Sequence, residues 1–347
     1  MDNQERAVAL VTGAGGYIGK QVTQKLAEQG FRVIGLVRER KDTAGSEVTG
    51  EKKMADEAVF QEECDISDYE RLESLFSKYR PNTVIHLAAI VHKRSLLSSY
   101  EDFYRINYEA SRNLFVLCSR YQVETVLFSS TVEVYGQAAG SLTSEKRRSS
   151  FVTKVVIDEN TPVDPQSDYG KTKLMAERAL IETASPEMRY GILRLAPVYG
   201  RGFSLNVDRR VYLKKDRLLY YFGDGSYFFN LCSVNNVTDF IVGFLSKPVP
   251  SGVYNLSDTG NYPVKELVER HRSRGILALR LPYSLTYLGI FLVEKLGCLI
   301  GKKSFISLYN FEKLFRCVVY SNKKAEGAFG EFTWDYANTM GEALDKK

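Results

Sequence analysis

A tyrosine and a lysine lie four residues apart in the segment S-D-Y-G-K-T-K at 167–173. At that spacing Tyr169 and Lys173 share one face of a helix, whereas Lys171 points elsewhere. A phenol with an ordinary pKa of about 10 is a poor base at neutral pH, but a neighbouring ammonium favours its ionised form. The pair therefore predicts a proton donor and acceptor, Tyr169, assisted by Lys173.

Such a pair needs a hydroxyl that holds the substrate oxygen, and the stretch S-S-T-V-E-V-Y-G at 129–136 supplies candidates. It directly follows an apolar run, Thr125–Phe128, that reads as a strand. Ligands bind at the carboxyl ends of the strands in parallel sheets. Thr131 or Ser130 is therefore placed for this role.

A glycine-rich loop near the N-terminus predicts the cofactor. In A-L-V-T-G-A-G-G-Y-I-G, Gly13, Gly16 and Gly19 are three residues apart. They allow a tight turn and a close approach of the backbone to a pyrophosphate, which the following helix N-terminus also attracts. Strand, loop, helix and second strand follow in the required order, which favours NAD or NADP over a glycine-rich turn that binds nothing.

The end of the second expected strand, G-L-V-R-E-R, bears on the choice between the two cofactors. Arg38 stands where an acidic residue would bind the ribose of NAD, and a guanidinium suits the 2′-phosphate of NADP. NADP is therefore favoured. NAD stays open, because Arg38 could face solvent while Glu39 accepts from the ribose.

Apolar runs of strand length alternate with helical stretches through the first two thirds of the chain, which predicts a Rossmann-type, doubly wound parallel α/β sheet. The clearest helices are Tyr100–Tyr121 and Lys171–Thr183, with Asp168 helping to start the second. The expected strands are Val8–Val11, Phe31–Val37, Thr83–Leu87, Thr125–Phe128 and Tyr190–Leu195.

Beyond Gly200 the alternation loosens, which indicates a smaller, mostly helical C-terminal lobe for the substrate. We expect the dinucleotide domain at 1–193, with 231–257 returning to it, and the substrate lobe at 194–230 and 258–347. Two polar inserts, 39–57 and 137–156, read as surface loops.

Composition narrows the partners and the compartment. The net charge of +5 without a basic block suits an anionic small molecule better than nucleic acid. Five scattered cysteines and no signal-like N-terminus predict a cytoplasmic protein with reduced thiols, and no cluster of ligating residues indicates a metal.

An apolar stretch near the C-terminus, 281–293, has an uncharged run of 13 residues between Arg280 and Glu294. This run is too short to span a bilayer, so no transmembrane segment is expected. We expect a buried amphipathic helix here, with weak contact to a membrane surface as the second interpretation.

In combination these motifs resemble the extended short-chain dehydrogenase/reductases, in particular the nucleotide-sugar epimerases, ketoreductases and dehydratases. The matching segments run in the family's order: T-G-A-G-G-Y-I-G (12–19), D-I (65–66), H-L-A-A (86–89), Asn107, S-S-T-V-E-V-Y-G (129–136), Y-G-K-T-K (169–173), R-L-A-P-V-Y-G (194–200) and G-D-G-S (223–226).

The resemblance implies a catalytic triad of Thr131, Tyr169 and Lys173, with Asp65 and Ile66 beside the adenine. It also implies a nucleotide-linked sugar substrate and a homodimer. The full set of expected cofactor-binding residues is Gly13, Gly16, Tyr17, Ile18, Gly19, Arg38, Asp65, Ile66, Leu87, Ala88, Ala89, Asn107, Ser129, Tyr169, Lys173, Pro197 and Val198. Candidates for substrate binding are Ser130, Glu133, Arg201 and Arg209.

Three departures from the family pattern bear on the reaction. Val132 replaces the acid of the dehydratases, so dehydration is disfavoured. Pro197 and Phe229 replace an asparagine and an arginine that bind the diphosphate in epimerases, and Arg201, Arg209 or Arg210 could compensate.

The leading hypothesis is therefore an NADP-preferring reductase of a keto group, most simply at C4 of a nucleotide-linked sugar. The alternative is a 4-epimerase with tightly bound NAD. A sterol or lipid alcohol dehydrogenase and a non-catalytic dinucleotide-binding protein are further alternatives.

Overall fold

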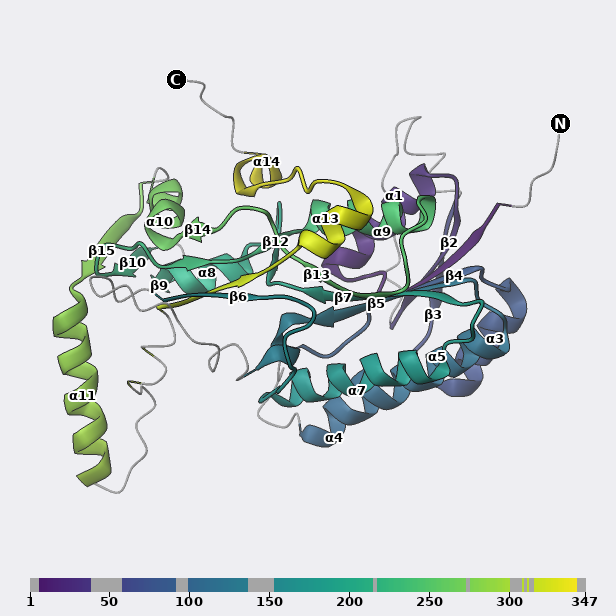
Figure 1. Cartoon of the computed structure of the whole chain (residues 1–347), viewed down its shortest axis with the longest axis horizontal. Coiled ribbons are helices and arrows are strands. Elements are labelled where there is room, and N and C mark those ends of the chain that lie inside the picture. The colour runs from purple at the N-terminus through teal and green to yellow at the C-terminus, as the bar shows by residue number, and fades with distance from the viewer. Residues whose placement is uncertain are drawn as a thin grey trace.

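The computed structural model describes residues 6–38, 58–91, 99–136, 153–214, 217–272, 275–299, 308, 311 and 315–341. Its main sheet has seven parallel strands in the order β13-β7-β5-β4-β1-β2-β3 (Figure 1). Their bounds are β1 Val8–Thr12, β2 Arg32–Val37, β3 Val59–Glu63, β4 Thr83–His86, β5 Thr125–Thr131, β7 Arg189–Leu195 and β13 Gly252–Leu256. The predicted doubly wound sheet is confirmed, and β13 lies in the main sheet beside β7.

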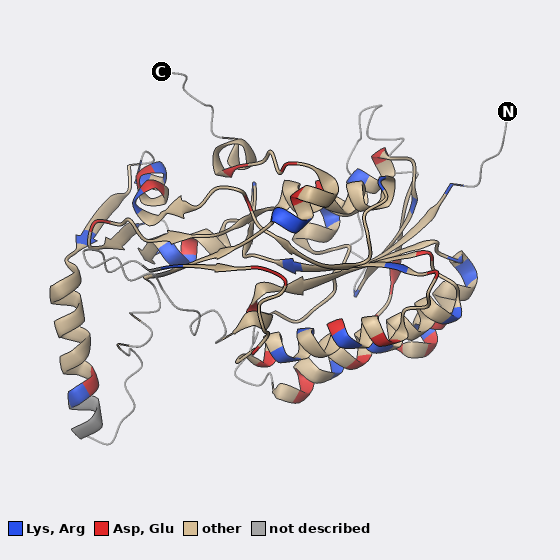
Figure 2. Cartoon of the chain, viewed as in Figure 1, with Lys and Arg blue, Asp and Glu red and all other residues tan. Residues whose placement is uncertain are grey.

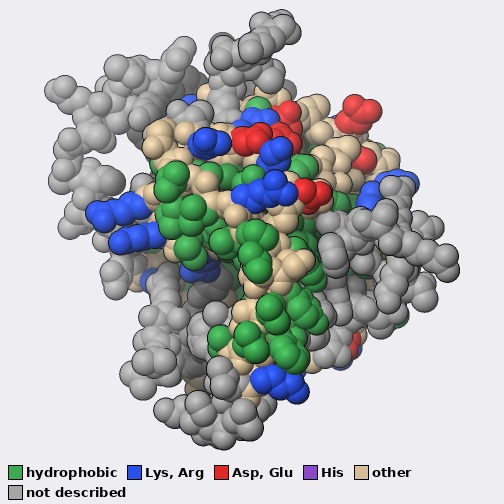
Figure 3. All heavy atoms as spheres, turned by 90° about the vertical axis from the view of Figure 1, so that its left-hand side faces the viewer, with side chains coloured by type: hydrophobic (Ala, Val, Ile, Leu, Met, Phe, Trp, Pro, Cys, Tyr) green, Lys and Arg blue, Asp and Glu red, His purple; other side chains and the backbone are tan. Residues whose placement is uncertain are grey.

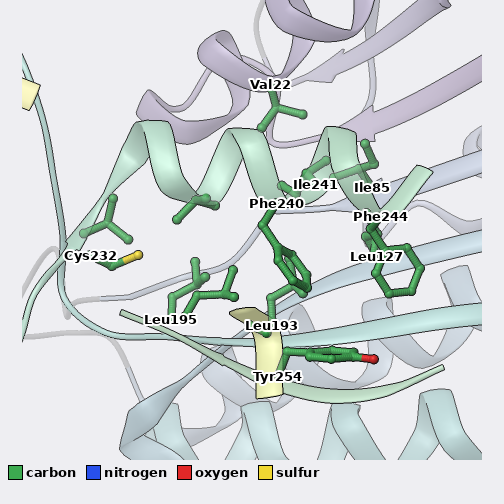
Figure 4. Close-up of a cluster of buried hydrophobic side chains, with 14 of the residues drawn as sticks. Val22, Ile85, Leu127, Leu193, Leu195, Cys232, Phe240, Ile241, Phe244 and Tyr254 are labelled. Atoms are coloured by element: carbon green, nitrogen blue, oxygen red, sulfur yellow. The ribbon is translucent and has the colours of Figure 1, made fainter. Parts of the chain in front are cut away.

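Helices cover both faces of this sheet (Figure 1). One layer holds α1 (Tyr17–Glu28), α9 (Val234–Ser246) and α13 (Lys323–Phe329), and the other holds α3 (Tyr69–Tyr79), α5 (Ala110–Arg120) and α7 (Asp168–Thr183). Between α9 and the sheet, Phe240 packs on Tyr254 of β13 with ring centroids 5.4 Å apart (Figure 4). This apolar burial holds the strand ends in fixed positions.

The helix predicted at Tyr100–Tyr121 is present as three consecutive helical segments. α4 (Tyr100–Phe103) is followed by a π-helical segment, Tyr104–Glu109, and then by α5. π-Helical insertions are rare and frequently occur at functional sites, and this one contains Asn107.

α7 begins at Asp168, three residues before the predicted start at Lys171. Ser167, and not Asp168, is the N-cap, and its Oγ accepts a hydrogen bond from Gly170 N at 3.0 Å. Asp168 lies in the first turn, where its negative charge interacts favourably with the positive end of the helix dipole.

The second lobe contains helices and short strands around an aromatic core. Its sheet pairs β9 (Tyr212–Lys214), β10 (Leu218–Phe222) and β15 (Leu277–Leu281), and β11 (Phe228–Phe229) pairs with β14 (Tyr262–Pro263). Its helices are α8 (Leu205–Val211), α10 (Val264–Arg272) and α11 (Tyr283–Leu299), with α14 (Tyr336–Met340) near the C-terminus.

Two short strand pairs join the lobes. β8 (Val198–Tyr199) pairs with β12 (Cys232–Ser233), and β6 (Thr153–Ile157) pairs in parallel with β16 (Arg316–Tyr320). The end of the expected loop at 137–156 is therefore a strand, because it gains backbone partners distant in sequence. The insert 39–57, Glu39 and residues 137–152 lie outside the described residues.

The expectation of a buried helix at 281–293 was wrong. α11 projects from the second lobe and exposes several large apolar side chains, with Leu285 68% and Leu288 52% exposed (Figure 1). None of the described helices is long and apolar enough to cross a bilayer.

Candidate active site

The predicted catalytic hydroxyls lie side by side at the carboxyl edge of the sheet. Thr131 is the last residue of β5, and Tyr169 lies in the first turn of α7. Burial raises the pKa of Tyr169, the nearby Glu133 carboxylate raises it further, and a hydrogen bond with Thr131 opposes them. Tyr169 is therefore a protonated phenol in the protein alone, and it needs a cation to ionise at neutral pH.

Lys173, one helical turn further along α7, is the candidate for that cation, and it is deeply buried. Its side chain is 1% exposed, and its Nζ lies 4.0 Å from the centroid of the Phe128 ring. Burial lowers the pKa of Lys173 to about 7, while the charge of Glu177 opposes the shift. No described residue accepts a hydrogen bond from its Nζ. Lys171 on the same helix is exposed, as the spacing predicts.

The geometry separates Thr131 from Ser130, which the sequence left as alternatives. Successive strand residues face opposite sides of a sheet. Ser130 Oγ donates to Glu177, whose carboxylate also forms a buried ion pair with Arg194 at 2.7 Å. Ser130 thus belongs to this ion-pair network, and Thr131 is the hydroxyl beside Tyr169.

The glycine loop closes tightly on the end of β4. Gly13 has a left-handed φ of +69°, and a Cβ there would approach Ala88 N to 2.9 Å. A Cβ on Gly19 would lie 2.2 Å from Gly13 O, so neither position accepts a side chain. Gly16, Tyr17 and Ile18 carry the loop into α1, whose N-cap is Gly16.

Thr12 ties this loop to the neighbouring strand end, a role that the sequence did not reveal. Its Oγ1 accepts hydrogen bonds from Leu87 N at 3.2 Å and Ala88 N at 3.1 Å. It also bonds His86 Nδ1 at 2.7 Å, and His86 Nε2 bonds Ser111 Oγ at 2.8 Å. Burial, and then the charge of Lys173, hold the pKa of His86 well below its usual value. His86 is therefore a neutral structural link, indicated in the sequence only by a histidine within an apolar strand.

Asn107 completes this scaffold. Its side chain pairs with the backbone of Ile90, accepting from N at 2.8 Å and donating to O at 2.9 Å. The amide is therefore engaged in holding the segment that contains Ala88 and Ala89. Asn107 therefore supports the backbone of the expected cofactor site.

The residues expected beside the adenine lie at the ends of β2 and β3. Asp65 accepts hydrogen bonds from Ser67 N at 2.9 Å and Ser67 Oγ at 2.7 Å, and these lower the pKa of its carboxyl group. Arg105 and Arg38 lower it further, so Arg38 lies near this carboxylate. Arg38 is exposed directly after β2, and Ile66 is buried.

The ends of β5 and β7 line the same edge. Ser129 is buried in β5 opposite Leu193 of β7. Pro197 and Val198 follow β7, and Pro197 O accepts from Cys232 N at 3.1 Å. A left-handed glycine, a close approach between two loops, and the orphaned Nζ of Lys173 together fit a dinucleotide.

On the substrate side, Glu133 is exposed and accepts from Ser167 Oγ at 2.7 Å. Burial raises the pKa of Tyr320 to about 12. The charge of Glu133 also raises this pKa and the charge of Arg210 lowers it, so Tyr320 lies near both side chains. Arg210 lies over the ring of Phe229, 5.1 Å from its centroid. The sequence singled out Arg209, which is exposed on the same helix, but Arg210 is the cation beside Phe229 and near Tyr320.

Arg201 links the lobe to the glycine loop through its backbone. Tyr17 donates its hydroxyl to Arg201 O at 3.0 Å, and its ring stacks on Phe203 at 4.6 Å. The Arg201 side chain is exposed and lies close to Gly341.

Comparisons with known proteins agree with this geometry. A family model described as the NAD dependent epimerase/dehydratase family matches residues 9–257. An Escherichia coli O157:H7 protein, N-acetyl-alpha-D-glucosaminyl-diphospho-ditrans,octacis-undecaprenol 4-epimerase, is 27% identical over 293 residues, which cover 81% of this chain and 80% of that protein. A UDP-glucose 4-epimerase of Azospirillum brasilense is 32% identical over 193 residues, 55% of this chain and 49% of that protein.

Solved structures share the fold. A UDP-glucose 4-epimerase from Thermotoga maritima with UDP-glucose has a TM-score of 0.68 at 22% identity, covering 96% of both chains. A Bordetella bronchiseptica enzyme in complex with NAD has a TM-score of 0.67 at 17% identity, covering 98% of this chain and 94% of that one. At these identities the likeness supports the fold alone, and the predicted fold class is confirmed.

Proposed function

The chain belongs to the NAD dependent epimerase/dehydratase family, and we propose that it is a 4-epimerase acting on a hexose joined to a diphosphate. The observation that carries this proposal is the buried Lys173 one helical turn after Tyr169, whose hydroxyl bonds Thr131 at the edge of the sheet. The named relatives are 4-epimerases, which favours this alternative over the reductase that we expected first.

Epimerisation at C4 requires the hydroxyl proton to leave and to return. Thr131 and Tyr169 would bind the sugar oxygen, and Tyr169 would take its proton and give it back. The charge of Lys173 offsets the cost of a buried phenolate, which burial and Glu133 otherwise oppose. NAD, when bound, supplies reversible removal of a hydride from carbon.

The cofactor would lie along the strand ends already described. Gly13, Gly16 and the N-terminus of α1 would hold the pyrophosphate. The bound cofactor would also give Lys173 Nζ a hydrogen-bond partner. Asp65 and Ile66 would flank the adenine. Arg38, exposed beside Asp65, would give affinity for a 2′-phosphate, so we propose that the site also accepts NADP.

The diphosphate needs a cation that the family arginine no longer supplies, because Phe229 stands in its place. We propose that Arg210 takes over this role. Its guanidinium lies over the Phe229 ring, and burial lowers its pKa, so an anion that neutralises it would be stabilising.

Dehydration has little support. Val132 occupies the position of the acidic residue of the dehydratases. It is 5% exposed and packs in the core, and its side chain cannot donate a proton. Glu133 is engaged with Ser167.

The test is interconversion without reductant. Purified protein should interconvert UDP-hexoses or UDP-N-acetylhexosamines with catalytic NAD, leaving the total of reduced cofactor unchanged. Stoichiometric consumption of NADPH on a 4-keto sugar, with no interconversion of the parent sugars, would restore the reductase hypothesis.

We also propose a cytoplasmic homodimer. Buried free cysteines, Cys64, Cys118, Cys232 and Cys317, suit a reducing compartment. Light scattering of the purified protein tests the dimer, and a mass of one chain would reject it.

A further inference from the structure

One side of α11 is covered by the second lobe, and the opposite side is bare. Tyr283, Tyr287 and Ile290 pack against the aromatic core of that lobe. Leu285, Leu288 and Leu292, spaced three and four residues apart, form a stripe on the other side and are 68%, 52% and 50% exposed. We call this stripe, with exposed Phe291 and Val293 beside it, the α11 face.

Among the described residues, an exposed basic side chain lies near each end of the α11 face. Exposed Lys295 lies 5.7 Å from the Phe291 ring centroid. Exposed Arg280 belongs to β15, the strand that leads into α11, and lies near exposed Asp224. The single acidic residue of the described helix, Glu294, accepts from Leu308 N at 3.0 Å. Figure 2 shows α11 uncharged along most of its length. Figure 3 shows hydrophobic side chains gathered on this end of the molecule, with Lys or Arg at their lower edge and both basic and acidic side chains above them.

We infer that the α11 face docks this protein on the surface of an anionic lipid bilayer. Apolar side chains that enter the interface, with basic ones at their border, are what binds a helix flat on such a surface. The finding that no described helix can span a bilayer agrees with a helix that lies in the interface.

This inference rests on the proposed function for its consequence at the active site. Docking would bring the site to sugars whose diphosphate is carried by a membrane lipid, the class of substrate in the name of the Escherichia coli relative. Soluble sugar nucleotides would then be accepted without any need for docking.

A second copy of this chain is a less suitable occupant. A two-fold contact places the same patch of both copies together, so the cations near its ends, Lys295 and Arg280, would be brought close to those of the other copy. Repulsion between like charges opposes that contact, whereas anionic headgroups neutralise the same cations.

The test is sedimentation with vesicles of phosphatidylcholine, with and without phosphatidylglycerol. The protein should sediment with the anionic vesicles. Leu288→Glu should lower the bound fraction by about tenfold or more, because it replaces buried apolar area by a charge. Ile181→Glu is the matched control, an aliphatic residue 49% exposed on α7, and it should change binding little.

Lys295→Glu should weaken binding to anionic vesicles by about fivefold or more and leave neutral vesicles unaffected. Equal sedimentation of Leu288→Glu and wild type, or no sedimentation of wild type, would overturn docking. So would a dimer that Leu288→Glu converts to monomer while vesicle binding is absent.

Activity separates this inference from the proposed function. Leu288→Glu should epimerise UDP-sugars as wild type does, but should lose activity on N-acetylglucosaminyl-diphospho-undecaprenol in vesicles. Vesicle binding without any epimerisation would reject the proposed function and keep docking, and normal activity of the variant on the vesicle substrate would reject the consequence drawn from docking.

Discussion

Glu177 and Arg194 form a buried ion pair, with Arg194 Nη2 2.7 Å from Glu177 Oε2, one helical turn beyond Lys173. Their side chains are 3% and 7% exposed, and Ser130 Oγ donates to the same carboxylate. The pair ties α7 to β7 one helical turn from Lys173. Removing one partner would leave the other charge buried and uncompensated.

Glu177→Gln is therefore expected to lower the free energy of unfolding by about 3–5 kcal/mol, because it strands the Arg194 guanidinium. Chemical denaturation measures this loss. Glu182→Gln, an exposed carboxylate on the same helix, should stay within about 0.5 kcal/mol of wild type. Similar stability of the two variants would show that the ion pair contributes little.

Tyr169→Phe keeps the ring, so folding and cofactor affinity should persist while turnover falls by about 10²–10⁴-fold through loss of the proton carrier. Lys173→Ala should also lower turnover and weaken cofactor binding. Lys171→Ala, at an exposed position, should do neither. Near-normal turnover of the phenylalanine variant, measured at saturating substrate, would contradict the catalytic assignment.

The low pKa of Lys173, about 7 against an ordinary 10.5, predicts how stability depends on pH. Between these values the native protein without cofactor binds fewer protons than the unfolded chain, so its stability should rise with pH. Below pH 7 the cost of the buried ammonium is fully present. Lys173→Met should therefore stabilise the cofactor-free protein at pH 6, by about 1–3 kcal/mol, and should flatten the rise. Thermal unfolding at several pH values checks both effects.

Arg38→Asp should weaken NADP binding at least about tenfold and change NAD binding much less, because it replaces a charge-assisted contact by repulsion of the 2′-phosphate. Titration of both cofactors by fluorescence gives the two affinities. Equal losses for NAD and NADP would show that Arg38 does not contact the phosphate.

Arg210→Ala should raise KM for a UDP-sugar by about 10–100-fold, the range for a lost hydrogen bond to a charged group, while kcat changes little. Arg209→Ala, its exposed neighbour on α8, is the control and should have a small effect. A larger effect at Arg209 would show that the diphosphate lies on the other side of α8.

The sequence by itself determined the features that depend on neighbouring residues. Strand-length apolar runs alternating with helices defined the parallel sheet, and the Gly13, Gly16 and Gly19 spacing defined the turn into α1. The interval from Tyr169 to Lys173 placed both on one face of α7, because helical periodicity alone fixes that relationship.

Contacts between distant segments decided the rest. Thr131 was separated from Ser130 by the pairing of β5 with β7 and by Glu177 on α7, none of which local pattern reveals. Arg210 was distinguished from Arg209 by the position of Phe229. The apolar pattern of α11 suits burial and membrane contact equally. Only the tertiary structure shows that Tyr283, Tyr287 and Ile290 pack on the second lobe while Leu285 and Leu288 stay exposed, because the pattern does not say which side meets a neighbouring element.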